Sequence, residues 1–295
     1  MKDSFRSGFV SLTGAPNVGK STILNVILGQ KISIVTEKPQ TTRNRILGIK
    51  TYEDAQIVFV DTPGIHSPRH MLGEKMVKAA KEALKEIDLV IFITEPGRNI
   101  NRDQAIIDLL RNLARPVILV INKIDRVKKK DILLMIDDYM KLHVFKELIP
   151  VSAIKKDGMD ILIKNILKYL PPGPKYYPDE LITDQMERSM AAEIIREKIM
   201  EKTSEEIPYS AAVEVMKWTD RKDGVILISA NIYVEREGQK GIIIGNKGEK
   251  LKSIGIAARN DIESLLNTKV FLELWVKVKK GWRDNKKFLD ELGYG

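Results

Sequence analysis

The chain has 295 residues, of which 43% are hydrophobic and 30% charged, a composition typical of a globular protein with two cores. It has no cysteine, which excludes disulfides, thiolate metal sites and cysteine nucleophiles, and no apolar run is long enough for a transmembrane helix. The first residues, MKDSFRSGFVSL, lack the apolar core of a secretory signal, so we expect a cytoplasmic protein. A net charge of +9 favours an anionic partner, either nucleic acid or an acidic membrane surface.

The first part of the chain alternates between short apolar runs and helical patterns. The runs are VSLTG, QIVFVDTPG, DLVIFITE, PVILVINK and LIPVSA. Such alternation predicts a doubly wound α/β domain with a mixed, mostly parallel sheet. RILGIKTY is joined to QIVFV only by EDA, which is too short for a crossover helix, so these two strands should be antiparallel neighbours. PPGPKYYP, residues 171–178, cannot continue a helix. We therefore expect a first domain over 1–171, a linker over 172–183 and a second domain over 184–295.

The first loop after a predicted strand is GAPNVGKS, which has the pattern G-x-x-x-x-G-K-[ST]. The backbone N–H groups of such a turn, with a helix N-terminus behind them, form an anion site that cradles nucleotide phosphates. Lys20 would reach the β- and γ-phosphates, and the Ser21 hydroxyl would bind Mg²⁺. The loop alone does not distinguish a GTPase from an ATPase or a small-molecule kinase. The residues expected to bind the nucleotide here are Gly14, Ala15, Pro16, Asn17, Val18, Gly19, Lys20, Ser21 and Thr22.

Two later segments supply candidates for the surroundings of the γ-phosphate. In EKPQTTRNRI a threonine hydroxyl could complete the Mg²⁺ shell, and Thr42 is preferred to Thr41 for this role. In DTPG, Asp61 would hold Mg²⁺ through water. Gly64 can present its N–H to the γ-phosphate because no side chain blocks the approach. The expected contacts of this segment are Asp61, Thr62, Pro63 and Gly64.

NKID, residues 122–125, follows the strand PVILVI and indicates which base is bound. The Asp125 carboxylate can accept two parallel hydrogen bonds from guanine N1–H and N2–H₂, whereas adenine would leave it unpaired. Lys123 would lie along the base, and Asn122 would tie this loop to the phosphate loop. In VSA, Ser152 would border the base and the N–H of Ala153 would meet guanine O6. NKID alone is equally compatible with a helix cap, and only its combination with the other motifs predicts guanine.

The second domain should run helix, two strands, two helices around a glycine loop, and a last strand, which is a small α+β fold. Two Gly-x-x-Gly segments compete for the role of a loop that clamps a nucleic-acid backbone. GQKG, residues 238–241, is interpreted as a strand-to-helix turn, and GNKG, residues 245–248, is preferred as the clamp. Residues 242–244 would pack the short helix on the sheet and line a base groove, while Ile256 and Leu265 would belong to the core. The residues expected to contact RNA are Ile243, Ile244, Gly245, Asn246, Lys247, Gly248 and Lys250.

The last segment carries cations around Trp282. Interleaved cations and an aromatic ring suit phosphate contacts and base stacking, so Lys280, Trp282 and Arg283 are further RNA-binding candidates. The alternative is a solvated basic edge whose tryptophan packs on its own domain, and the sequence favours neither. Trp275 is expected in the core.

The order of these motifs over about residues 7–171 resembles the translation-factor-related GTPases. This resemblance implies a switch in which residues 36–45 and 64–73 are ordered by the γ-phosphate and released after hydrolysis. Ile65 stands where Ras-like proteins carry a glutamine that orients water, so intrinsic hydrolysis should be slow. Asn17 matches an asparagine that helps to hold K⁺ in potassium-stimulated relatives. We assign the catalytic step to Lys20, Thr42, Gly64 and Asn17.

The helix-first order of the second domain, with GNKG between its two adjacent helices, resembles a type II KH domain. With FLELWVKVKKGWRDNKKFLDELGY, residues 271–294, nearly the whole chain resembles the Era family of bacterial ribosome-assembly GTPases. The resemblance implies Mg²⁺-dependent hydrolysis of GTP to GDP, stimulated by K⁺ and RNA. It also implies binding to the 3′ end of 16S rRNA during maturation of the 30S subunit, a monomeric state and a loose inner-membrane association.

Three other functions stay open at the level of sequence. The chain could be an RNA-binding protein whose nucleotide pocket is only structural. It could be a GTPase whose small domain binds protein, or a membrane-surface GTPase that uses its basic face on anionic lipid.

Overall fold

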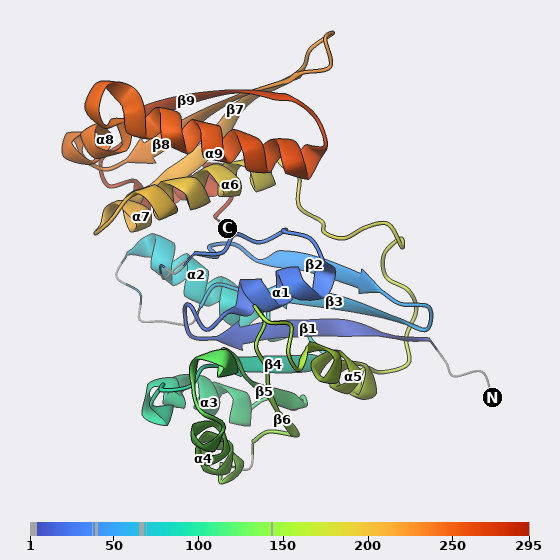
Figure 1. Cartoon of the computed structure of the whole chain (residues 1–295). Coiled ribbons are helices and arrows are strands. Elements are labelled where there is room, and N and C mark those ends of the chain that lie inside the picture. Colours follow the sequence, from blue (N-terminus) through green and yellow to red (C-terminus); the bar gives the residue numbers. More distant parts are fainter. Residues whose placement is uncertain are drawn as a thin grey trace. The chain divides into compact units, whose positions relative to one another are not determined.

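The chain divides into two compact units in a computed structural model, which describes residues 5–36, 38, 41–64, 68, 70–142 and 144–294 (Figure 1). The first unit comprises residues 1–33, 42–67 and 76–184, and the second comprises 34–41, 68–75 and 185–295. Within the described ranges, no helix is long and apolar enough to span a membrane.

The first half of the chain forms a six-stranded sheet in the order β2-β3-β1-β4-β5-β6. Its elements are β1 (Arg6–Gly14), α1 (Lys20–Leu28), β2 (Ile46–Thr51), β3 (Ala55–Asp61), α2 (Met71–Glu82), β4 (Leu89–Thr94), η1 (Ile100–Asp103), α3 (Gln104–Arg111), β5 (Val117–Ile121), η2 (Ile124–Arg126), α4 (Lys129–Met140), β6 (Glu147–Pro150) and α5 (Met159–Tyr169). β2 is antiparallel to β3 and the other pairs are parallel, so the predicted mixed α/β sheet is confirmed. The carboxyl ends of β1, β3, β4 and β5 therefore meet at one edge, where ligands bind in such sheets.

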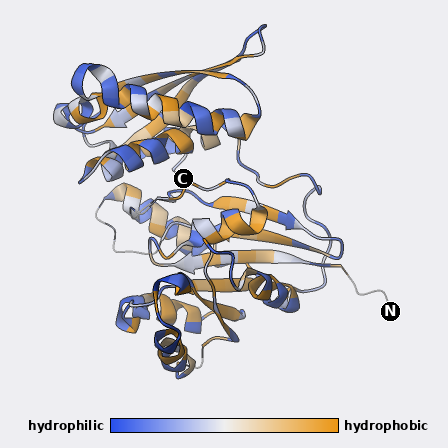
Figure 2. Ribbon diagram, in the orientation of Figure 1, coloured by the Kyte–Doolittle hydropathy of each residue, from blue (hydrophilic) through white to orange (hydrophobic). Residues whose placement is uncertain are grey.

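Helices cover both faces of this sheet. Successive side chains of each strand point to opposite faces, and because the strands are mostly apolar, both faces need to be buried. Gly48 of β2 faces α1 so closely that an added Cβ would lie 2.7 Å from Leu24 Cδ1. Its neighbours Leu47 and Ile49 point to the opposite face. On that opposite face, α3 and Tyr139 of α4 pack against the apolar side chains of β4 and β5. Figure 2 shows helices α3 and α4 striped with hydrophilic and hydrophobic residues, as expected of helices that cover a core.

The second unit has a three-stranded sheet in the order β7-β8-β9, with one face covered by helices. Its elements are α6 (Glu187–Lys202), α7 (Ile207–Ser210), β7 (Ala212–Asp220), β8 (Ile226–Val234), α8 (Glu237–Ile244), η3 (Asn246–Gly248), α9 (Glu249–Leu266), β9 (Val270–Val278), η4 (Trp282–Asp284) and α10 (Lys286–Glu291). β7 pairs antiparallel with β8, and β9 pairs parallel with it. The even-numbered residues of β8 face α6 and α9, where Ile195, Ile199, Ile254 and Ile262 complete the core.

Neither tryptophan near the C-terminus lies where an RNA-stacking Trp282 and a core Trp275 would place it. The prediction that Trp275 lies in the core is wrong: its side chain is 60% exposed, because odd-numbered residues of β9 point away from the helices. Trp282 is fully buried, and its indole N–H donates to the Ser210 carbonyl at 2.9 Å. A ring enclosed in this way cannot stack on RNA bases, so the proposed RNA contact of Trp282 is corrected to a structural role.

Candidate nucleotide site and nucleic-acid interface

The phosphate loop connects β1 to α1 in a conformation that requires glycine. Gly19 has φ of 100°, and an added Cβ would lie 2.2 Å from Asn122 Nδ2. Lys20 is the first residue of α1 and is buried, with Nζ donating to the carbonyls of Gly14 at 3.3 Å and Ala15 at 2.9 Å. Burial lowers the pKa of Lys20 to about 8, against the opposing effect of the Asp61 carboxylate. The loop is thus shaped around a buried cation that an anion would stabilise.

A cluster of oxygen atoms surrounds Asp61 at the end of β3. Oδ2 of Asp61 accepts hydrogen bonds from Ser21 Oγ at 2.8 Å, Ser33 Oγ at 3.1 Å and Thr42 Oγ1 at 3.4 Å. Oδ1 is buried without a hydrogen-bond partner among the residues that the structure describes. Burial raises the pKa of Asp61, while Lys20 and the three hydroxyls favour its charged form.

This cluster brings together the three residues predicted to hold Mg²⁺, namely Ser21, Thr42 and Asp61. Thr42 and Ser21 are also joined to each other, at 3.0 Å between their hydroxyls. The hydroxyl of Thr41, by contrast, donates to the Lys38 carbonyl at 2.7 Å. An all-oxygen donor set with an unsatisfied, buried carboxylate oxygen fits a hard divalent cation.

The loop after β5 contacts the phosphate loop directly, as predicted for Asn122. Its Nδ2 donates to the Val18 carbonyl at 2.9 Å. Lys123 has φ of 63°, and its Nζ donates to the Asn17 carbonyl at 2.6 Å. The Ala153 N–H, which we expect to meet guanine O6, donates to Asn122 Oδ1 at 3.1 Å in this structure.

Asp125 has an exposed carboxylate at the same edge of the sheet. Ser152 Oγ donates to Asp125 Oδ1, and this bond holds the pKa of Asp125 below its ordinary value. Asp125 is therefore charged at neutral pH, as an acceptor for two guanine N–H groups must be.

Gly64 lies against the phosphate loop, where an added Cβ would be 2.8 Å from the Pro16 backbone nitrogen. Thr62 and Pro63 are buried, and Thr62 Oγ1 donates to the Leu12 carbonyl at 3.1 Å. Ile65, the position that replaces a water-orienting glutamine, lies outside the described residues. The remaining residues of the predicted site, Ala15, Val18 and Thr22, lie in the loop and the first turn of α1.

In the second unit, GNKG forms an exposed turn between α8 and α9. Gly245, Lys247 and Gly248 all have positive φ, at 73°, 46° and 82°. Asn246 and Lys247 at its tip are exposed. The interpretation of GQKG as a strand-to-helix turn is wrong, because these residues lie inside α8. Of the two Gly-x-x-Gly segments, GNKG therefore has the geometry of a loop whose main chain can approach phosphates.

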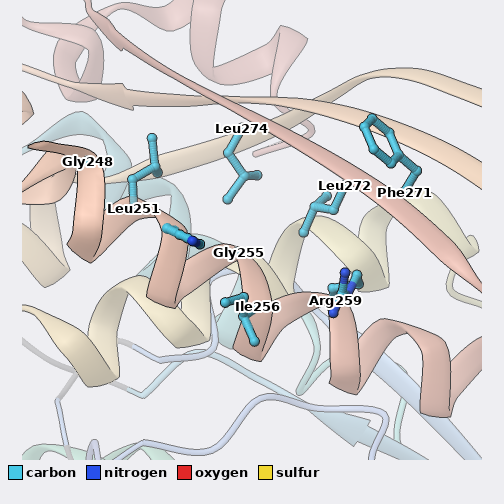
Figure 3. Close-up of a pocket in the computed structure, with 9 residues that line it drawn as sticks. Gly248, Leu251, Gly255, Ile256, Arg259, Phe271, Leu272 and Leu274 are labelled. Carbon is cyan, nitrogen blue, oxygen red and sulfur yellow. The ribbon is translucent and has the colours of Figure 1, made fainter.

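A groove of about 380 Å³ lies beside this loop, between α9 and β9 (Figure 3). Ile256 is 46% exposed and lines the groove, so its assignment to the core is wrong, whereas Leu265 packs against the core. Ile243 is fully buried in the core and does not line the groove, and Ile244 is half-buried. Sequence reasoning therefore missed most of the groove, which is lined by Gly248, Leu251, Lys252, Gly255, Ile256, Arg259, Phe271, Leu272 and Leu274.

Three other cations proposed for RNA contact differ in how exposed their side chains are. Lys280 is exposed. Arg283 is only 18% exposed and forms an ion pair with Glu235. Lys250, next to GNKG, is half-buried, with its Cβ only 2.7 Å from a Cβ added at Gly245.

Comparisons with known proteins agree with this geometry. Residues 9–123 match a family described as a 50S ribosome-binding GTPase, and residues 206–283 match the KH domain. GTPase Era of Geobacter metallireducens is 54% identical, with 98% of each chain covered, and GTPase Era of Ruminiclostridium cellulolyticum is 50% identical, with 99% of this chain and 98% of the relative covered. The chain belongs to the Era family of GTPases. As an Era-family protein it hydrolyses GTP.

Solved Era structures share the whole fold. A variant of Aquifex aeolicus Era bound to GDP and AlF4⁻ is 43% identical, with a TM-score of 0.96 and coverage of 99% of this chain and 100% of that one. An Era complex with MgGDPNP and nucleotides 1506–1542 of 16S ribosomal RNA is 44% identical, with a TM-score of 0.95 and coverage of 99% of both chains. The combination of a P-loop GTPase domain with a C-terminal KH domain is therefore confirmed.

Proposed function

We propose that this GTPase binds the 3′ end of 16S rRNA through its KH unit, in a manner that depends on the bound nucleotide, and so assists assembly of the 30S subunit. The observation that carries the proposal is that one chain holds residues fitted to a guanine nucleotide, gathered at one edge of a sheet, and a GNKG loop beside an open groove. A relative that is 44% identical over the full chain holds both MgGDPNP and this RNA segment.

In the nucleotide site, backbone N–H groups of the phosphate loop would bind the phosphates, and Lys20 would exchange its two carbonyl acceptors for β- and γ-phosphate oxygens. That exchange replaces neutral acceptors with charged ones, which a buried ammonium favours. Asp125 would select guanine. Asn122 keeps the base loop and the phosphate loop together, so both ends of the nucleotide meet a preformed site.

Ser21, Thr42 and Asp61 would hold Mg²⁺, which supplies charge neutralisation at the β- and γ-phosphates when bound. Loss of the γ-phosphate would remove the acceptor of the Gly64 N–H and an oxygen ligand of the Mg²⁺ that Thr42 would hold. Thr42 and Gly64 lie in the two predicted switch segments, residues 36–45 and 64–73. We therefore infer that the conformation of these segments differs between the GTP-bound and GDP-bound states.

In the KH unit, the glycine loop would hold the RNA backbone while bases enter the groove between α9 and β9. Gly245 and Gly248 keep side chains away from the loop's main chain, and Lys247 places a cation at its tip. The groove is lined mainly by apolar side chains. Lys252 and Arg259 also line it and would donate hydrogen bonds to base edges or phosphates.

Reversing the charge of Lys247 and Lys250 together to glutamate should weaken binding to a single-stranded copy of the 16S rRNA 3′ end by about tenfold or more. The slope of log K against log[salt] should fall at the same time, because fewer counterions are released. The matched control reverses Lys129 and Lys130, two exposed lysines of α4, which changes net charge equally. Fluorescence anisotropy across a salt series measures both the RNA affinity and its salt dependence. Equal losses in the two variants would point to overall charge and against the loop.

Potassium should accelerate GTP hydrolysis about tenfold over sodium at equal ionic strength, because a bound cation can stabilise charge that develops between the phosphates. Asn17 lies in the phosphate loop, where its backbone φ is 66°. Changing Asn17 to alanine should abolish the difference between the two salts. Single-turnover phosphate release measures it, and a rate that does not depend on the cation in the unmodified protein would reject this role.

A monomeric state and a peripheral association with the inner membrane complete the proposal. The net charge of +9 supports the membrane association, because a basic protein is attracted to anionic lipid. Sedimentation with anionic vesicles, with and without competing RNA, tests whether lipid and RNA share one basic face. Size-exclusion chromatography with light scattering tests the monomer.

A further inference from the structure

Glu95 is the first residue after β4, the strand that lies between those leading to the two nucleotide-binding loops. β4 pairs with β1, which ends in the phosphate loop, and with β5, which ends in NKID. The Asn122 N–H donates to the Thr94 carbonyl at 2.9 Å, which extends the pairing of β4 and β5 by one residue. The sheet therefore places Glu95 between the phosphate loop and the base loop.

The Glu95 carboxylate contacts the lysine of NKID. Its Oε2 lies 2.5 Å from Lys123 Nζ, and the same Nζ donates to the Asn17 carbonyl at 2.6 Å. Both side chains are largely enclosed, at 28% exposure for Glu95 and 19% for Lys123. The ammonium group is thus fixed from two sides, by a charge from the central strand and by a dipole from the phosphate loop.

A lysine side chain is long and flexible, and ordering it when a ligand binds has an entropic cost. Here the ion pair orders it in advance, and the left-handed backbone of Lys123 sets its starting direction. Without Glu95, the ammonium group would keep one neutral acceptor and would be free to turn towards solvent.

We propose that Glu95 is a positioning residue for guanine nucleotides, which holds Lys123 against Asn17 so that the base loop and the phosphate loop form one preformed site. Glu95 acts through Lys123 and does not touch the reacting atoms. The inference rests on the guanine nucleotide site proposed above. Because GDP and GTP share the guanosine that Lys123 would cover, Glu95 affects both nucleotides equally.

Changing Glu95 to alanine should weaken binding of GDP and of a non-hydrolysable GTP analogue by about tenfold each. Glu95→Gln should lose less, because its amide oxygen still accepts from Lys123. In steady state, KM for GTP should rise about tenfold while kcat stays within about twofold, a split that misfolding would not produce. The matched control is Glu147→Gln, which removes the charge that pairs with Lys168 at 2.7 Å at the start of β6, on the opposite edge of the sheet.

A double-mutant cycle with Lys123→Ala decides whether Glu95 acts through the lysine. The double variant Glu95→Ala/Lys123→Ala should bind GDP no more weakly than Lys123→Ala alone. Unchanged binding by Glu95→Ala, or a loss that adds in full to that of Lys123→Ala, would overturn the inference. Failure of the unmodified protein and of Glu147→Gln to bind guanine nucleotides would instead overturn the proposed site, and the inference with it.

Discussion

Replacing Asp125 with asparagine should weaken GTP binding on the order of 100-fold, because two hydrogen bonds to a charged acceptor are lost. The new amide would also place its NH₂ group against a guanine N–H. Xanthine carries a carbonyl oxygen where guanine carries its 2-amino group, so the same variant should bind xanthosine triphosphate better than the unmodified protein does. Competition of each triphosphate against fluorescent GDP measures the two changes.

The structure gives this prediction a clear control. Asp138 of α4 is also an exposed aspartate paired with a neighbouring side chain, Lys141, at 3.2 Å, and it lies outside the nucleotide site. Asp138→Asn should bind GTP as the unmodified protein does. If Asp125→Asn kept its preference for GTP over xanthosine triphosphate, the assignment of Asp125 to the base would be wrong.

Replacing Lys20 with alanine should lower kcat/KM for GTP by about 100-fold or more, because the γ-phosphate loses its one buried cation from the phosphate loop. Removal of this ammonium group also leaves the buried Asp61 carboxylate without a nearby positive charge. The loss should therefore appear both in the affinity for nucleotide and in the hydrolysis step. Single-turnover hydrolysis at saturating enzyme separates the two.

Stability has to be measured alongside activity for Lys20→Ala. Burial disfavours the charged lysine, as its lowered pKa of about 8 shows, and the relief of this cost on its removal offsets the loss of the positive charge near Asp61. Thermal unfolding without nucleotide should be similar for the variant and the unmodified protein. A variant that unfolds normally and still hydrolyses GTP at the original rate would contradict the assigned role of Lys20.

The guanine nucleotide site was largely predictable because its residues come in short segments whose local geometry carries the chemistry. GAPNVGKS needs glycine at the positions that approach other chain segments, as Gly19 does at Asn122. The choice of Thr42 over Thr41 agrees with the cluster around Asp61. Ser33 and Glu95 were missed because each reaches the site through sheet register or loop folding, and neither stands in a motif.

In the second unit, features that depend on contacts between distant segments could not be predicted from sequence patterns. The bounds of α9 and β9 follow from periodicity, but the pattern of β9 does not say which of its faces meets the helices, so Trp275 was assigned to the wrong one. Trp282 was undecided because its hydrogen bond to Ser210 joins residues 72 positions apart. The groove was missed for the same reason: it forms where α9 and β9 come together, and Ile256 alone does not reveal it.

We propose that this chain couples its nucleotide state to RNA binding. The most direct test is fluorescence anisotropy with a single-stranded copy of the 16S rRNA 3′ end and a scrambled control, first with GDP and then with a non-hydrolysable GTP analogue, across a salt series. The protein should bind the true sequence more tightly than the scrambled control, and only with the GTP analogue. Equal affinity in the two nucleotide states, or no preference for the true sequence, would contradict this proposal.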